Sequence, residues 1–402
     1  MRNLKIHNFG PVKEADINIK NVNLFIGQQS VGKSTIAKLI TIFTDYLTVA
    51  SLIVQNEKSF ESFLKSYDLD VYANDDYSIE YDLIEDDLNL HLNITKGNLT
   101  CKCFYNGEAC NDKEIIFGRV SGQKLNHIYH KDVVERINSA LKEGISNKEE
   151  FNSYIINVLD NSIYIPAERN IYSVVNKLQP ALLMLGGSAP STLLRFMVEI
   201  GKAEVAYPVL DMPVLNLIYQ HENSQNFFKL KDDSDKKFPL VNGSSGIQSA
   251  TPLLLLLEYA LNKKEYGSFV IEEPECNLFP SKQVELLNRI LEIPSAERIL
   301  TITTHSPYLL SAFNNYLFAG TIITENTSLK DKITEKFPGM PVLYSKDCSV
   351  YSLGEDINDG VYCKSLMDEE TGMIDVNSLD VISGEMSLQF DQLQNLLVEN
   401  ME

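Results

Sequence analysis

Gly27-Gln-Gln-Ser-Val-Gly-Lys-Ser34 is the stretch of this chain that decides its fold. It follows the apolar run Asn23-Leu-Phe-Ile26, which predicts a short buried strand. After it, apolar side chains recur at helical spacing, at Ile36, Leu39, Ile40 and Phe43. A helix is therefore expected to begin near Lys33. A glycine-rich turn between a strand and a helix is the setting in which phosphate-binding loops occur.

The residue types in this loop support that prediction. Gly27 and Gly32 let the backbone turn so that successive N–H groups point at one phosphate, and the helix N-terminus attracts the same charge. Lys33 is expected to neutralise the β- and γ-phosphates of a nucleotide, and the Ser34 hydroxyl to ligate Mg²⁺. The predicted nucleotide contacts are consecutive: Gly27, Gln28, Gln29, Ser30, Val31, Gly32, Lys33, Ser34 and Thr35.

Two later strands are expected to end in side chains that act on the same phosphates. Phe269-Val-Ile-Glu-Glu273 ends in adjacent carboxylates, and successive side chains of a strand point to opposite sides. We therefore expect Glu272 to hold the Mg²⁺ shell and Glu273 to polarise the attacking water as general base. The strand Arg298-Ile-Leu-Thr-Ile-Thr-Thr-His305 delivers a histidine, which is a candidate to hydrogen-bond the γ-phosphate or that water.

Ser245-Gly-Ile-Gln248 lies shortly before the paired carboxylates. The run Leu253-Leu-Leu-Leu-Leu257 predicts a helix that is buried all round. Ser245 and Gln248 have the spacing of a capping box, so this helix is expected to begin at Ser245 and to offer N–H groups and a hydroxyl to an anion. An ordinary helix cap is the alternative interpretation, and the position before the carboxylates favours the anion site.

The order of these segments predicts an α/β fold. An amphipathic helix marked by Val284, Leu287 and Leu291 lies between the last two strands, so strand, helix and strand alternate as a parallel sheet requires. Alternating stretches at 88–94 and 99–104 predict β-hairpins.

Four parts of the chain are expected from this pattern. Residues 1–168 form a first lobe with the phosphate loop and the hairpins, and residues 169–243 a helical second lobe. Residues 244–325 complete the core, with a further strand at 318–324. Residues 326–402 form an acidic extension packed on that core.

Composition restricts the classes of function. The chain has 402 residues and a formal net charge of −20. This charge opposes broad contact with nucleic acid, because Lys and Arg must displace counterions from phosphates, and it suits solubility or a basic protein partner. No run of about 18 apolar residues predicts a membrane span. Six cysteines without framework spacing, and no signal-peptide pattern at the start, fit a reduced cytoplasm.

A zinc site is an alternative interpretation of the residues Cys101, Cys103, Cys110, His127 and His130. Their spacing lacks the CxxC knuckle that structural zinc sites use. Cysteines at alternate positions of a strand are expected to serve packing.

Together these segments resemble the ABC-type ATPases related to RecF, the SMC proteins and the OLD-like ATPases. The resemblance is greatest to the compact AAA-family ATPases of bacterial anti-phage defence systems of the PARIS and Septu types. The segments that carry it are Asn8-Phe-Gly-Pro-Val12, Gly27 to Thr35, Ile165-Pro-Ala-Glu-Arg169, Ser245-Gly-Ile-Gln248, Glu272-Glu-Pro-Glu275 with Asn277-Leu278, and Thr304-His-Ser-Pro307. The fold it implies is a P-loop NTPase head with a mixed sheet, a hairpin-rich first lobe and a helical second lobe.

The resemblance implies a head-to-tail dimer that closes around ATP and Mg²⁺. Ser245, Gly246 and Gln248 would then contact the ATP of the partner head, while Glu275 and Asn277 would lie in the loop that communicates between the two sites. The chain departs from the family pattern at two positions. Ile247 replaces a glycine of the signature, and Glu272 replaces an aspartate, which is compatible with water-mediated contact to Mg²⁺.

Glu168 and Arg169 stand where such heads carry a glutamine that senses nucleotide. Arg169 is expected to contact a phosphate or the partner head, or else to anchor the second lobe through a salt bridge.

The activity implied is hydrolysis of ATP to ADP and phosphate by a cytoplasmic protein. The leading hypothesis is a sensor or scaffold that holds a separate effector, such as a nuclease, in anti-phage defence, because no DxD pair of a Toprim nuclease follows residue 320. A RecF-like repair ATPase acting on DNA is the alternative, which the negative charge disfavours. The energy subunit of a transporter is less favoured, since the chain lacks LSGGQ and a glutamine loop.

Overall fold

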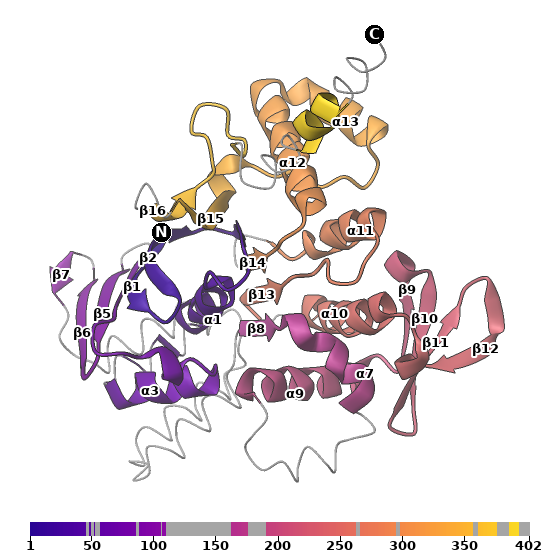
Figure 1. The fold of residues 1–402 in the computed structure, drawn as a ribbon, viewed down its shortest axis with the longest axis horizontal. Helices are drawn as coiled ribbons and strands as arrows, with labels where there is room; N and C mark the ends of the chain where they lie inside the picture. Colours follow the sequence, from indigo (N-terminus) through magenta and orange to yellow (C-terminus); the bar gives the residue numbers. More distant parts are fainter. Residues whose placement is uncertain are drawn as a thin grey trace.

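The computed structural model describes residues 1–45, 48–49, 52, 57–85, 88–105, 107–109, 162–175, 190–262, 266–294, 298–356, 361–375 and 386–393. Over this part of the chain, three β-sheets alternate with helices (Figure 1). The predicted α/β class with a mixed sheet is confirmed. No helix in these ranges is both long and apolar enough to cross a bilayer.

A six-stranded sheet with the order β16-β15-β3-β14-β13-β8 crosses the middle of the molecule (Figure 1). Its strands are β3 (Val22–Gly27), β8 (Ser162–Ile165), β13 (Ser268–Glu272), β14 (Ile299–Thr303), β15 (Cys348–Asp356) and β16 (Val361–Ser365). All neighbours pair in parallel except β16, which is antiparallel to β15. β8, β13 and β14 are buried at every residue, because helices or a second sheet cover both faces.

The register of this sheet places the predicted catalytic residues at one edge. Glu272 on β13 lies opposite Thr303 on β14, and Thr303 lies opposite Phe25 on β3. The carboxyl ends of these parallel strands therefore meet beside the loop that follows Gly27. This is the edge at which open α/β sheets bind ligands.

An antiparallel sheet with the order β2-β1-β4-β5-β6-β7 forms most of the first lobe. Its strands are β1 (Arg2–Phe9), β2 (Val12–Ile19), β4 (Ser78–Glu85), β5 (Leu88–Thr95), β6 (Asn98–Tyr105) and β7 (Glu108–Ala109). The predicted strands at 88–94 and 99–104 are confirmed as β5 and β6, which pair as a hairpin. The helix α3 (Glu57–Ser66) and the 3-10 helix η1 (Asp70–Tyr72) complete the described part of this lobe.

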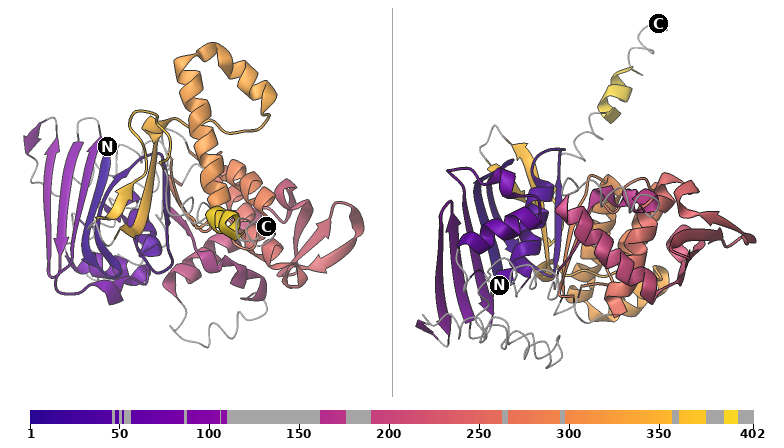
Figure 2. Two further views of the ribbon diagram at one scale, coloured as in Figure 1. Left: turned by 45° about the horizontal axis from the view of Figure 1, so that its top comes forward. Right: turned by 90° about the horizontal axis from the view of Figure 1, so that it is seen from below.

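The helix α1 (Lys33–Thr44) packs between this sheet and the central sheet (Figures 1 and 2). Its apolar residues are fully buried, and the Phe43 ring stacks on Tyr81 of β4 with centroids 5.0 Å apart. Each such side chain contributes about 1.5–3 kcal/mol when buried. This packing fixes the start of α1, and with it Lys33 and Ser34.

The second lobe contains helices and a third sheet. Its elements are η2 (Ala167–Ile171), α7 (Tyr172–Val175), α9 (Ser191–Ala206), β9 (Val209–Met212), η3 (Pro213–Leu215), β10 (Leu217–Glu222), β11 (Gln225–Leu230), β12 (Asp233–Pro239) and η4 (Leu240–Asn242). The strands form an antiparallel sheet in the order β12-β11-β10-β9.

The prediction that residues 169–243 form a helical lobe is therefore wrong for residues 209–239. Leu217 and Tyr219 are fully buried, and the residues that flank Tyr219 are partly exposed, so burial alternates with a period of two. Asn223 and Ser224 join β10 to β11 with positive φ values of 51° and 58°, as a two-residue hairpin turn requires.

The remaining helices extend from the other side of the central sheet to the top of the view in Figure 1. They are α10 (Ser245–Asn262), α11 (Pro280–Ile290), α12 (Pro307–Glu325) and α13 (Lys330–Lys336), with the 3-10 helices η5 (Thr327–Leu329) and η6 (Ser345–Asp347). The strand expected at 318–324 is wrong, because these residues form the second half of α12. Leu317, Gly320 and Ile323 are buried at helical spacing, and this outweighs the β-branched composition of the segment.

Residues after 325 include two strands of the central sheet. β15 pairs with the phosphate-loop strand β3, so this part of the extension belongs to the core. Residues 386–393 are helical and exposed, and Figure 2 shows this short helix standing away from the body of the molecule.

Candidate functional site

The loop between β3 and α1 has the backbone that the glycine pattern predicts. Gly27 and Gly32 have φ values of +141° and +89°. A Cβ atom at Gly27 would lie 2.5 Å from the Leu353 carbonyl oxygen, and one at Gly32 would lie 2.7 Å from the Val12 side chain. Gln28, Gln29 and Ser30 form the exposed tip of the loop, whereas Thr35 is buried in the first turn of α1.

Lys33 lies inside this loop. Its Nζ donates hydrogen bonds to the carbonyl oxygens of Gly27 and Gln28 at 3.0 and 2.6 Å. Burial lowers the pKa of Lys33, and the carboxylates of Glu273, Glu272 and Glu275 oppose this shift. The ammonium group is therefore held at the centre of the loop, within electrostatic reach of three carboxylates.

Glu272 is the last residue of β13 and is 4% exposed. The hydroxyl groups of Ser34 and Tyr164 hydrogen-bond to it, and burial raises its pKa. Its Oε1 atom is buried and has no hydrogen-bond partner among the described residues. Hard cations prefer oxygen ligands, so this oxygen and the Ser34 hydroxyl fit a Mg²⁺ ion.

Glu273 follows Glu272 directly in the chain, and its side chain contacts His305 and Cys276. Its Oε1 lies 3.4 Å from Nε2 of His305, and its Oε2 accepts a hydrogen bond from Cys276 Sγ at 3.2 Å. The hydrogen bond from His305 is the main cause that lowers the pKa of Glu273 to about 2. The carboxylate is ionised at neutral pH and half-buried, and it is thereby available to orient a water molecule.

Glu275 joins the loop after β13 to the end of β14. Its Oε1 accepts hydrogen bonds from Thr304 Oγ1 at 2.6 Å and from the His305 backbone nitrogen at 2.8 Å. Burial raises the pKa of this carboxyl group. Glu275 thereby fixes the backbone of His305 within one chain. Its expected role between two chains stays a prediction.

The segment Ser245–Gln248 forms a separate part of the site. Ser245 is exposed in the first turn of α10, and a Cβ atom at Gly246 would lie 2.7 Å from the Asn277 carbonyl oxygen. This close approach joins α10 to the loop after the paired carboxylates.

The predicted capping box is wrong. The Ser244 hydroxyl, one residue earlier, accepts from the Ile247 nitrogen at 3.4 Å. The Gln248 amide donates to the carbonyls of Val241 and Gly243, and its oxygen accepts from Ser173 Oγ. Gln248 therefore holds the start of α10 through contacts inside the chain.

Arg169 does not lie where the prediction placed it. Its side chain is 0% exposed, so it contacts neither the surface nor the open part of the phosphate loop. Its described partners are backbone carbonyl oxygens, and no salt bridge in the described ranges involves it. The expected contact with a phosphate or the partner head is therefore corrected. The alternative holds with one change, because Arg169 anchors the second lobe through hydrogen bonds to backbone carbonyls and not through a salt bridge.

Two residues beside the loop were missed by the sequence analysis. The Tyr362 hydroxyl on β16 hydrogen-bonds to the carbonyls of Pro11, at 2.6 Å, and Val31. Gly354 on β15 packs against Val31, since a Cβ atom there would lie 2.7 Å from its side chain. These contacts join segments that lie far apart in the chain, so no local sequence pattern predicts them.

The zinc alternative receives no support from the described residues. Cys103 is buried on β6, while Cys110, His127 and His130 lie outside the described residues. The described ranges contain no group of three or more His, Cys, Asp or Glu side chains placed to hold a metal.

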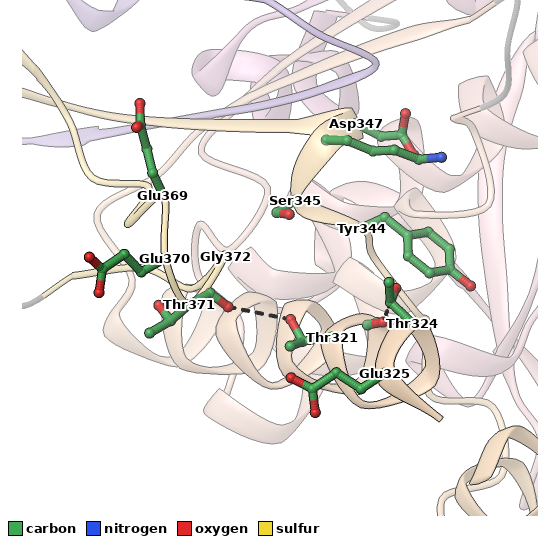
Figure 3. Close-up of a pocket in the computed structure, with 12 residues that line it drawn as sticks. Thr321, Thr324, Glu325, Tyr344, Ser345, Asp347, Glu369, Glu370, Thr371 and Gly372 are labelled. Carbon is green, nitrogen blue, oxygen red and sulfur yellow. Dashed lines mark hydrogen bonds between the residues drawn. The ribbon is translucent and has the colours of Figure 1, made fainter. Parts of the chain in front are cut away.

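A cavity of about 610 Å³ lies away from these motifs (Figure 3). It is lined by the second half of α12, by η6 and by residues 369–372, and it contains none of the predicted site residues. Its lining includes four acidic residues: Glu325, Asp347, Glu369 and Glu370.

Comparisons with known proteins give one family match. A family model described as an AAA ATPase domain matches residues 195–310, which is less than half of the chain. The SMC head domain from Thermotoga maritima is 14% identical, with 77% of this chain and 90% of that chain covered and a TM-score of 0.35. An SmcHead bound to the C-winged helix domain of ScpA is 12% identical, with 77% and 91% covered and a TM-score of 0.36.

No curated protein matches the chain. The matched segment holds α10, β13, α11 and β14, and with them the paired carboxylates and His305. Residues 195–310 thus carry the sequence pattern of an AAA ATPase domain.

Proposed function

We propose that this chain binds ATP with Mg²⁺ and hydrolyses it to ADP and phosphate. The observation that carries the proposal is the meeting of Lys33, Ser34, Glu272, Glu273 and His305 at one edge of the central sheet. A glycine loop alone would support phosphate binding. The ionised Glu273 beside the loop lysine adds a group that can act on water.

The backbone N–H groups of the loop and the Lys33 ammonium hold the phosphates in this proposal. Ser34 and Glu272 would hold Mg²⁺, which when bound neutralises phosphate charge. Glu273 accepts a hydrogen bond from the attacking water and then takes its proton. The water oxygen forms a bond to the γ-phosphorus, the bond between that phosphorus and the bridging oxygen breaks, and ADP leaves with the electron pair. His305 keeps the Glu273 carboxylate in place through Nε2.

The proposal includes a second copy of the chain as partner. Ser245 is exposed at the N-terminus of an 18-residue helix, where a hydroxyl and free N–H groups suit an anion supplied from outside the chain. Gly246 lets this helix approach Asn277 closely. Gln248 supports the segment through its contacts to Val241, Gly243 and Ser173, so its proposed role is to shape the anion site.

The finer role proposed is that of a cytoplasmic sensor or scaffold that controls a separate effector in anti-phage defence. Its support is the resemblance and the acidic composition, which includes no Lys or Arg after Lys364. Co-expression with the product of a neighbouring gene, followed by co-purification and phage challenge, tests this role. Turnover stimulated by DNA, with binding that falls steeply with salt, would instead favour a RecF-like role.

The decisive experiment for the activity is a direct one. Equilibrium binding of ATP and release of phosphate are measured for the parent chain and for Lys33→Ala. The parent is expected to bind and hydrolyse ATP in the presence of Mg²⁺, and Lys33→Ala to lose binding. Lys332→Ala, at an exposed position of α13, is the control and is expected to keep ATP binding. A parent chain that binds no ATP would overturn the proposal.

A further inference from the structure

Arg169 has a set of contacts that the proposed ATPase mechanism does not use. A guanidinium group carries five N–H donors in one plane. Nε donates to the Ser249 carbonyl at 3.1 Å, and the two Nη atoms donate to the carbonyls of Pro166, Glu272, Glu273 and Pro274 at 3.2, 2.7, 2.8 and 3.2 Å. The five contacts account for the five donors.

These carbonyl groups belong to two motifs. Ser249 lies in the second turn of α10, directly after the Ser245–Gln248 segment. Glu272, Glu273 and Pro274 are the end of β13 and the start of the loop that follows it. One planar side chain therefore bridges the helix that carries Ser245 and the backbone that carries both acids.

The backbone at Glu273 needs such support. Its φ is +42°, in the left-handed region that residues other than glycine rarely adopt. The Glu273 nitrogen donates to the Thr303 carbonyl at 2.9 Å, and the Glu273 carbonyl accepts from Arg169. The unusual conformation that aims the Glu273 carboxylate is thus held on one side by β14 and on the other by Arg169.

The complete burial of the Arg169 guanidinium group also requires an explanation. Arg169 is completely enclosed, and burial lowers its pKa while the Cys276 thiol and three nearby carboxyl groups oppose the shift. Charged groups are costly to bury, so their retention in a core indicates a specific requirement. Lysine would not meet it, because an ammonium group has three donors and no planar fork.

We propose that Arg169 is a positioning residue that couples the Ser245 end of α10 to the carboxylate of Glu273. A displacement of α10 when Ser245 engages the ATP of a second copy is transmitted through the Ser249 carbonyl to the backbone of Glu272 and Glu273. The close approach of Gly246 to the Asn277 carbonyl joins the same two segments. This inference rests on the proposed ATPase function.

Arg169→Lys tests the inference, with Arg289→Lys as the matched control. Arg289 also contacts α10, through Glu258, and its other described partner is Glu292, so neither ion pair involves the loop after β13. Arg169→Lys is expected to lower kcat at least tenfold while ATP affinity changes less than threefold, and Arg289→Lys to change neither. An Arg169→Lys variant with the parental kcat would overturn the coupling.

Chemical rescue adds a readout that a general loss of stability would not give. Arg169→Gly removes the fork, and guanidinium at millimolar concentration is expected to restore part of kcat. Methylammonium, which has the charge without the fork, is expected to restore none. Equal rescue by both cations would show that charge alone acts there, contrary to the inference.

Hydrogen exchange tests the coupling between the start of α10 and the loop after β13 in the folded parent chain. A non-hydrolysable ATP analogue is expected to slow amide exchange in 245–250 and 273–278 together, and Arg169→Lys to remove this parallel change. Protection of one segment without the other in the parent would overturn the inference even if every Arg169 variant failed to fold. Failure of the proposed function looks different, because the parent would then neither bind nor hydrolyse ATP.

Discussion

The Glu275 carboxylate lies 2.8 Å from the backbone nitrogen of His305, and so joins the loop after β13 to the end of β14. The same oxygen accepts from Thr304 Oγ1. This bridge sets the position from which the His305 ring reaches Glu273. The carboxylate is buried, so loss of its oxygen leaves two donors without a partner.

Glu275→Ala is accordingly expected to lower kcat about tenfold with little change in ATP affinity, because unsatisfied buried donors cost about 1–3 kcal/mol. Glu275→Gln keeps an acceptor oxygen and is expected to retain most of the turnover. Steady-state kinetics of the two variants show whether the hydrogen bonds of Glu275 support kcat. Equal loss in both would show that the negative charge, not the hydrogen bonds, is required.

Glu273→Gln is expected to bind ATP and to hydrolyse it at least about 100-fold more slowly, because general-base catalysis contributes about 10²–10⁴-fold. With the base lost, ATP persists and the two copies are expected to stay closed, which size-exclusion chromatography with ATP and Mg²⁺ detects as a dimer. Glu292→Gln, an exposed carboxylate paired with Arg289, serves as control. Parental turnover in Glu273→Gln would remove Glu273 from the role of base.

The two adjacent carboxyl groups are expected to affect stability at acid pH with opposite signs. The folded-state pKa of Glu273 is depressed to about 2 from an ordinary 4.5, so its stabilising contribution is present above pH 4.5 and is lost as pH falls toward 2. The pKa of Glu272 is raised, so its contribution declines as pH rises above 4.5. Denaturant unfolding between about pH 3 and pH 6, a range that brackets the ordinary pKa of a carboxyl group, measures both contributions to stability. In Glu273→Gln the acid-induced loss is expected to be smaller than in the parent, and an equal loss would contradict the assignment.

Glu272→Gln is expected to raise the thermal midpoint of the ligand-free chain, because it removes a buried charge whose Oε1 has no described partner. The same change is expected to weaken the dependence of ATP binding on Mg²⁺. Thermal scans with EDTA and with ATP and Mg²⁺ separate the two effects. A lowered midpoint in EDTA would mean that the carboxylate stabilises the fold without a cation.

Tyr362→Phe removes the hydroxyl that binds the Val31 and Pro11 carbonyls, and leaves the aromatic packing in place. ATP affinity is expected to fall about fivefold, since one hydrogen bond contributes about 1 kcal/mol. Tyr351→Phe is the matched control, because its hydroxyl accepts from the Asn18 nitrogen and does not contact the loop. Isothermal titration compares the variants, and equal affinities for both would show that Tyr362 does not support the loop.

Local patterns in the sequence predicted the elements whose signals are local. The β3–α1 turn, the strand before Glu273 and the helix with Val284 have a clear period and distinct end residues, and the structure has them as β3, α1, β13 and α11. The hairpin at β10 and β11 was missed because its turn, Asn223-Ser224, is a weak turn signal without glycine. The second half of α12 was missed because Ile322 and Ile323 favour strands locally while the helix buries one face.

The partners of Arg169 were beyond the reach of the sequence. Its hydrogen bonds are made to backbone carbonyl oxygens, which every residue has, so the residue types in the sequence do not predict them. The neighbours of β3 posed the same difficulty. β15 pairs with β3 in parallel through hydrogen bonds that carry no signature in either segment.

The place of β3 between β14 and β15 has a consequence for biosynthesis. Asn23 of β3 hydrogen-bonds to Leu300, 277 residues later, and to Ser349, 326 residues later. A ribosome must therefore add 277 residues after Asn23 before the strand that leads into the glycine turn has either neighbour. Contacts of such long range slow folding, so nascent chains would pass through a prolonged stage exposed to chaperones and unable to retain nucleotide.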